Sequence, residues 1–220
     1  MKLLIDFQTQ QGNAVRNDCG FACVAMAAGV PLAMVLERIP PAPQGMYILD
    51  VMDGLRLLGV ANEYVHPLHL PDARRWLANG NPIVALVNYG RLPQQLRATA
   101  YSGNHYVVIV GYEPDGGFLV HDPLWPDERG AFRIWPDAVL GEAWANPVNA
   151  LPLQGVVVKN VFEVAEVAMG DVLPLVRDEA ARNAVAYLEQ LLGAMDVRPG
   201  PLAERVEHAL AWVEMKKGRA

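Results

Sequence analysis

A cysteine, a histidine and an aspartate follow one another along the sequence, each in a setting that suits nucleophilic chemistry. Cys19 comes after Asn17-Asp18 and opens a run of small and apolar residues that is unbroken to Ala28, the pattern of a buried helix with a capped start. A helix start carries about half a positive charge and unpaired N–H groups, which favour thiolate over thiol. Cys19 is therefore the candidate nucleophile. The alternative is a small buried hydrophobic residue.

The other two candidates stand at the ends of neighbouring predicted strands. His105 enters an apolar strand over residues 106–112, where it can act as the ion-pair partner and proton shuttle of a thiolate. The Asp-Gly-Gly sequence at 115–117 predicts a hairpin, so residues 118–121 return beside that strand and lead into Asp122. A carboxylate there would accept the other ring N–H of the imidazole and fix its tautomer. Taken singly, each residue also has an ordinary structural interpretation. His105 would be a hydrogen-bonded or surface histidine, and Asp122 would be an aspartate that starts a turn before proline.

The elements that must position these residues run helix first and sheet later, which indicates an α+β fold. Residues 3–8 predict a short strand ahead of the first helix. Helices are predicted over 19–28, 31–38, 48–58 and 71–79, and strands over 62–65, 82–87, 106–112, 118–121 and 132–135. Residues 88–104 form a polar loop between two of those strands.

Three segments also carry a family resemblance. They are Asn-Asp-Cys-Gly-Phe-Ala-Cys-Val-Ala-Met at 17–26, Pro-Ile-Val-Ala-Leu-Val-Asn-Tyr-Gly at 82–90, and residues 104–123. In content and order they resemble the C39-like family of papain-like cysteine peptidases, over roughly residues 3–150. The resemblance implies a central helix packed on an antiparallel sheet, with Cys19 as nucleophile, His105 as base and then acid, and Asp122 as the residue that orients it. It also implies a thiol hydrolase that cleaves a peptide or isopeptide bond in a peptide or protein through an acyl-enzyme.

The family further places a glutamine upstream of the cysteine, whose amide completes an oxyanion hole. Gln8, Gln10 and Gln11 compete for this role. Gln8 is favoured because it directly follows the predicted strand, and Gln11 is the fallback. The sequence departs from the family at Phe21, where proline is frequent.

Other candidate residues are weaker. Cys23 lies one helical turn after Cys19 and is expected to pack in the core. His121 alternates to the strand face opposite Asp122. His66 and His69 match no common zinc spacing with the cysteines, so neither a metal nor a cofactor is expected.

Composition excludes several classes of function. The net charge is −6, from 18 Lys+Arg against 24 Asp+Glu, and there is no basic block, so nucleic acid is not the expected partner. No apolar run approaches the roughly 18–20 residues that cross a bilayer, and the start is charged too early for a signal peptide, so no membrane contact is expected. The single serine, Ser102, is not in a nucleophile elbow. Two cysteines four apart do not form a secreted disulfide framework, which indicates the cytoplasm.

The domain prediction is a peptidase domain at 1–151 and an extension at 152–220 with a strand segment and a helical hairpin. The hairpin has one apolar stripe that must be covered: Leu188, Leu191, Leu192, Val206, Leu210 and Val213. A homodimer or a protein partner is therefore expected there. Two rivals to the peptidase remain: an inactive binding module with the same fold, and a non-proteolytic amidase or acyl transferase with the same triad.

Overall fold

The computed structural model describes residues 1–11, 17–39 and 44–159 of the chain. This part is α+β, as predicted, with helices α1–α3 before the sheet. The helices are α1 (Cys19–Ala28), α2 (Leu32–Arg38), α3 (Ile48–Leu57), α4 (Leu70–Ala78) and α5 (Asp137–Ala145), with short 3-10 turns η1 (Tyr89–Arg91), η2 (Gln94–Leu96) and η3 (Glu128–Gly130). The strands are β1 (Asn62–Val65), β2 (Ile83–Asn88), β3 (Asn104–Tyr112), β4 (Phe118–His121), β5 (Arg133–Trp135) and β6 (Gly155–Val158).

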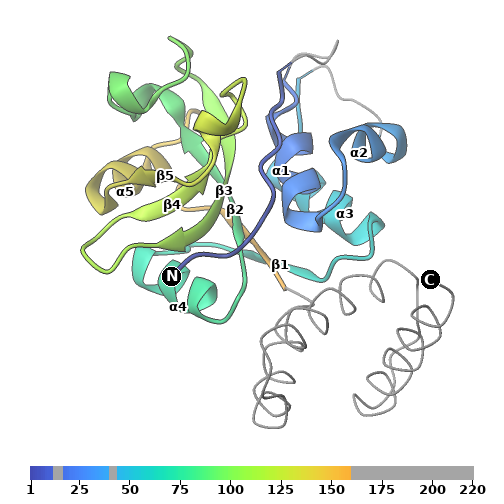
Figure 1. Cartoon of the computed structure of the whole chain (residues 1–220), viewed down its shortest axis with the longest axis horizontal. Coiled ribbons are helices and arrows are strands. Elements are labelled where there is room, and N and C mark those ends of the chain that lie inside the picture. Colours follow the sequence, from blue (N-terminus) through green and yellow to red (C-terminus); the bar gives the residue numbers. More distant parts are fainter. Residues whose placement is uncertain (12–16, 40–43, 160–220) are drawn as a thin grey trace, which may run out of the picture. The chain divides into compact units, whose positions relative to one another are not determined.

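The sheet has six strands in the order β1-β6-β2-β3-β4-β5, and every neighbouring pair is antiparallel. Helices α1, α2 and α3 cover one face, while α4 and α5 cover the other (Figure 1). Because successive side chains of a strand point to opposite faces, β3 contributes to both cores. Tyr106, Val108 and Val110 pack toward α1, and Val107 and Ile109 pack toward α4 and α5.

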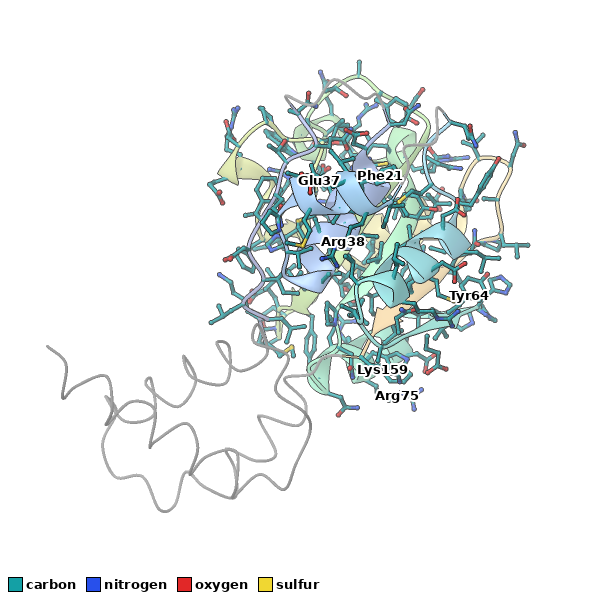
Figure 2. All side chains as sticks on the ribbon, turned by 90° about the vertical axis from the view of Figure 1, so that its right-hand side faces the viewer. Phe21, Glu37, Arg38, Tyr64, Arg75 and Lys159 are labelled. Atoms are coloured by element: carbon teal, nitrogen blue, oxygen red, sulfur yellow. The ribbon has the colours of Figure 1, made fainter. Side chains whose placement is uncertain are left out.

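Helix α1 is the buried central helix that its apolar run predicts. Residues 20–26 are all buried, and Phe21 among them is 1% exposed. Figure 2 labels Phe21 on this helix. Gly29 ends the helix at φ 66°, a left-handed conformation that glycine adopts without strain. Asp18 occupies the N-cap as predicted, but its side chain makes no capping hydrogen bond.

The N-terminal residues form an extended strap along the sheet in place of the predicted strand at 3–8. Lys2 makes a single bridge to Gly111, and the backbone N–H of Leu3 donates to the carbonyl of Val110 at 2.7 Å. A Cβ at Gly111 would collide with the carbonyl oxygen of Met1, so glycine allows the strap to approach. Further along, the N–H of Gln10 donates to the carbonyl of Pro123 at 2.9 Å. The strap thus runs from the far end of β3 to the residue after Asp122.

The sheet extends beyond residue 151, where the sequence placed the domain boundary. Strand β6 pairs with both β1 and β2 and is buried along its whole length, so it completes the six-stranded sheet. The chain divides into compact units Met1–Val161 and Phe162–Ala220. The second unit, with the predicted helical hairpin, lies outside the described residues, and its role in self-association or docking stays a prediction.

Within the described ranges, no single helix is long and apolar enough to cross a membrane. The pair α1 and α2 would pass by length and composition only, and it is bent by 112°.

Candidate active site

Cys19 is the first residue of α1 and its side chain is half-buried. Cys23, one turn later, is completely buried, as predicted. Burial raises the pKa of the Cys23 thiol well above its ordinary value, so this sulfur stays a protonated core atom. Of the two cysteines, only Cys19 at the helix start is a partly exposed residue.

His105 and Asp122 meet at the end of the sheet next to that helix start. The β3–β4 hairpin forms as predicted, with Val108 opposite His121, so the chain returns beside β3. The Nε2 of His105 lies 2.8 Å from Oδ1 of Asp122, and the two side chains are 2% and 0% exposed. This contact uses one ring nitrogen, which leaves Nδ1 for the thiol.

The thiol of Cys19 and the imidazole of His105 are coupled by a hydrogen bond and by charge. Burial acts to raise the pKa of Cys19, but the interactions with His105 outweigh it and lower that pKa below its ordinary value. The backbone N–H groups of Tyr106 and Gly20 act in the same direction. A thiolate is therefore favoured at the start of α1.

The pKa of the His105 imidazole is raised, whereas that of the Cys19 thiol is lowered. Burial acts to lower the pKa of His105, but the hydrogen bond and charge of Asp122, together with Cys19, raise it to about 9. The pair is therefore thiolate and imidazolium between the lowered pKa of Cys19 and about pH 9. Such a pair combines a ready nucleophile with a ready proton donor.

His121 points away from this site, as its alternation along β4 predicted. Its Nε2 donates to the carbonyl of Ile5 at 2.8 Å, and its Nδ1 accepts from the N–H of Phe132 at 3.0 Å. Burial is the main reason that the pKa of His121 falls to about 4, so the ring is neutral and fastens the N-terminal strap to the sheet.

The prediction that Gln8 supplies the oxyanion amide is wrong. Its Nε2 donates to the carbonyl of Val30 at 2.8 Å, and its Oε1 accepts from the N–H of Leu32 at 2.7 Å. Those residues follow the C-terminal end of α1, and a ten-residue helix is about 15 Å long. The Gln8 amide is therefore bound at the end of the helix opposite Cys19.

The two other glutamines lie nearer the site because the strap crosses the segment after Asp122. Gln10 is half-buried and its backbone is bonded to Pro123, whereas Gln11 is exposed and donates its amide to the carbonyl of Leu124 at 3.1 Å. Gln8 was favoured because the sequence predicts that a strand ends there, but the strap continues past Gln8 to Gln10, whose N–H donates to the carbonyl of Pro123.

Tyr89 is a site residue that sequence reasoning missed. It follows β2 directly, is completely buried, and donates its hydroxyl proton to Oδ2 of Asp122 at 2.8 Å. The sequence around Tyr89 shows only an aromatic residue between a buried strand and a glycine. That local pattern does not predict a hydrogen bond to Asp122, which is 33 residues later in the chain. The N–H of Leu124 also donates to Oδ1 of Asp122, at 3.0 Å.

Among the described residues, no group of three or more His, Cys, Asp or Glu side chains is placed to hold a metal ion. The side chains that meet at this site include a thiol, an imidazole, a carboxylate and a phenol. Tyr101 is exposed and its ring centroid lies 6.3 Å from that of Tyr89; burial and the charge of Cys19 raise the pKa of its phenol.

Comparison with known proteins agrees with this architecture. The model of the Peptidase_C39 like family matches residues 55–149, a range that contains His105 and Asp122 and begins after Cys19. No curated protein sequence matches the chain significantly. Among solved structures, a C39-like peptidase from Bacillus anthracis superposes with a TM-score of 0.55 at 15% identity, over 72% of this chain and 97% of that one.

Two further structures are similar at lower TM-scores. A double-glycine-motif protease from an AMS/PCAT transporter, solved with its leader peptide, has a TM-score of 0.48 and 16% identity over 71% of this chain and 92% of its own. The peptidase domain of Streptococcus ComA has a TM-score of 0.48 and 15% identity over 69% and 96%. The family match and the fold shared with the Bacillus anthracis protein confirm that this chain is similar to the C39-like family of papain-like cysteine peptidases.

Proposed function

We propose that this protein is a cysteine peptidase that hydrolyses a peptide or isopeptide bond with Cys19, His105 and Asp122. The observation that carries the proposal is the coupling of the Cys19 thiol, whose pKa is lowered, to a buried imidazole whose other nitrogen is held by a carboxylate; Cys19 itself is a partly exposed residue. A purely structural cysteine has no need of such an arrangement, because burial alone leaves a thiol protonated and inert.

The reaction follows from the protonation states. The Cys19 thiolate attacks the substrate carbonyl carbon, and imidazolium His105 gives its proton to the leaving nitrogen, so an acyl-enzyme and a free amine result. Neutral His105 then takes a proton from a water molecule, which attacks the thioester and releases the acid. Asp122 keeps its hydrogen bond to Nε2 throughout and stabilises each imidazolium state.

Two donors are proposed to hold the negative oxygen of each tetrahedral intermediate. One is the backbone N–H of Cys19, since the first N–H groups of a helix have no partner within it. The other is the side-chain amide of Gln10, which is half-buried on the strap segment fastened to Pro123. Gln11 is the alternative.

Gln10→Ala is expected to lower kcat by roughly 10²–10³ with little change in KM, the usual effect of losing one oxyanion donor. Gln8→Ala is the matched control: it removes the bonds to Val30 and Leu32 and is expected to lower the melting temperature while kcat stays within about two-fold. Steady-state kinetics and thermal unfolding of both variants check this. A loss of kcat in Gln11→Ala alone would assign the donor to Gln11 instead.

The proposal is tested by trapping the nucleophile. The full chain is incubated with a peptide aldehyde or vinyl sulfone library, and covalent adducts are detected by intact mass and located by peptide mapping. We expect adducts on Cys19 and none in Cys19→Ala. Absence of any adduct in the folded wild type would favour the inactive binding module.

Product analysis separates the remaining rival. Peptide fragments that end in a free carboxylic acid are expected from a peptidase, whereas fragments whose acyl group is joined to an added amine would indicate an acyl transferase. Release of ammonia from side-chain amides would indicate an amidase.

A further inference from the structure

Tyr89 is bonded at three points that together fix its hydroxyl against Asp122. Its backbone N–H donates to the carbonyl of Gly103 at 2.9 Å, and its carbonyl accepts from the N–H of Leu92 at 3.2 Å. Its Oη accepts from the N–H of Ala98 at 2.7 Å. A hydroxyl has a single proton, so an Oη that accepts from Ala98 directs that proton to Oδ2 of Asp122, 2.8 Å away.

This hydrogen bond completes the environment of a buried carboxylate. Oδ1 of Asp122 accepts from Nε2 of His105 and from the N–H of Leu124, at 2.8 and 3.0 Å, while Oδ2 accepts from Tyr89. Donors on both oxygens fix the rotation of the carboxylate plane. They also offset the cost of burying a charge that is 0% exposed. Burial and the Asp122 charge raise the pKa of Tyr89 far above the working range, so the phenol remains a donor.

The ring of Tyr89 also touches the imidazole itself. Its centroid lies 5.0 Å from that of His105 at an interplanar angle of 75°, an edge-to-face packing that restricts rotation of the imidazole. One side chain therefore limits the motion of both Asp122 and His105. Through the N–H of Ala98, Tyr89 also links these two residues to the segment between β2 and β3, which contains Tyr101.

We propose that Tyr89 is a positioning residue that acts through Asp122 to keep His105 aligned with Cys19. The inference rests on the proposed function. Loss of the phenol hydroxyl lets the carboxylate rotate and weakens its hold on the imidazole. The hydrogen bond and charge that His105 offers to Cys19 then weaken too, and the pKa of the thiol rises.

The test measures the rate of Cys19 alkylation by iodoacetamide against pH, which needs no substrate. In Tyr89→Phe the acid limb of the profile is expected to move to higher pH by about half a unit or more, since the pKa of Cys19 depends on His105. With a peptide that the wild type cleaves, kcat is expected to fall by about 10²-fold with KM nearly unchanged. Tyr64→Phe, a change on β1 that removes a hydroxyl donating to Oε1 of Gln154, is the matched control and should leave both readouts unchanged.

A double-mutant cycle separates positioning from general stability. In an Asp122→Ala background, Tyr89→Phe is expected to change the alkylation profile and kcat by less than about two-fold, because the residue through which it acts is gone. Equal effects in both backgrounds, or an unchanged profile in Tyr89→Phe, would overturn the inference.

A second variant covers the case in which Tyr89→Phe does not fold. Ala98→Pro removes the N–H that bonds to Oη, and the preceding Arg97 already has the extended conformation that a residue before proline adopts, φ −93° and ψ 138°. It is expected to shift the profile in the same direction, and an unchanged profile would again overturn the inference. A wild type whose Cys19 is alkylated no faster than an ordinary thiol at neutral pH would instead refute the proposed function.

Discussion

Cys19→Ala is expected to abolish hydrolysis and to leave the fold intact. The substitution removes the sulfur that is proposed to form the acyl-enzyme, and a bound water has no comparable position or nucleophilicity. Residual turnover should be at least about 10⁴-fold below wild type, in line with the loss of a covalent nucleophile. Cys19 is half-buried at a helix start, so its truncation leaves no closed cavity and should change the free energy of unfolding by less than about 1 kcal/mol.

Cys23→Ala is the matched control for this experiment. It removes the same atom from the completely buried position one turn along α1, where a cavity remains, and should lower stability by about 1 kcal/mol or more while activity persists. Turnover, melting temperature and intact mass after alkylation are measured for both variants. Full turnover in Cys19→Ala, or its loss only in Cys23→Ala, would contradict the assignment of the nucleophile.

His105→Ala is expected to lower kcat by about 10⁴-fold or more, because the proposed base and the proposed acid of the reaction are one side chain and are lost together. It should also change the pH dependence of Cys19 alkylation. In the wild type the lowered pKa of Cys19 keeps the thiolate present below the pH at which an ordinary thiol ionises. Without His105, burial is left to raise that pKa, so the alkylation rate should rise only at higher pH.

His69→Gln is the control for a histidine as such, because His69 is exposed and makes no side-chain capping bond at the start of α4. Both its kcat and its alkylation profile should match the wild type. The wild-type kcat should fall above about pH 9, where His105 loses the proton that the leaving nitrogen requires. An alkylation profile in His105→Ala identical to that of the wild type would show that the imidazole does not act on the thiol.

The sequence by itself determined the parts of the site that depend on local pattern. An unbroken apolar run after Asp18 fixes a buried helix whose first residue is Cys19. A turn of Asp-Gly-Gly between two apolar segments fixes the hairpin that brings Asp122 back toward His105. Both rest on contacts between residues close in sequence, where periodicity and turn chemistry suffice.

Only the tertiary structure decided what depends on contacts between distant segments. The sequence alone does not distinguish Gln8 from Gln10 and Gln11. In the folded protein the N-terminal strap places Gln8 against Val30, at the end of α1 opposite Cys19. Strand β6 looks like part of an extension until it inserts between β1 and β2. Helix α5 has a glycine inside its nine residues and only a weak periodic signal, and packing of Leu140 and Trp144 in the core stabilises it.

Tyr89 shows the same limit at the site itself. Tyr89 follows β2 and Asp122 follows β4, and a hydrogen bond joins their side chains. The residues around either position do not predict this contact. The order of strands in the sheet sets which side chains meet, and that order is the result of burial summed over the whole chain. The sequence therefore indicated the thiol, the imidazole and the carboxylate as candidates, and the fold decided which phenol bonds to that carboxylate and which glutamines lie beside the segment after Asp122.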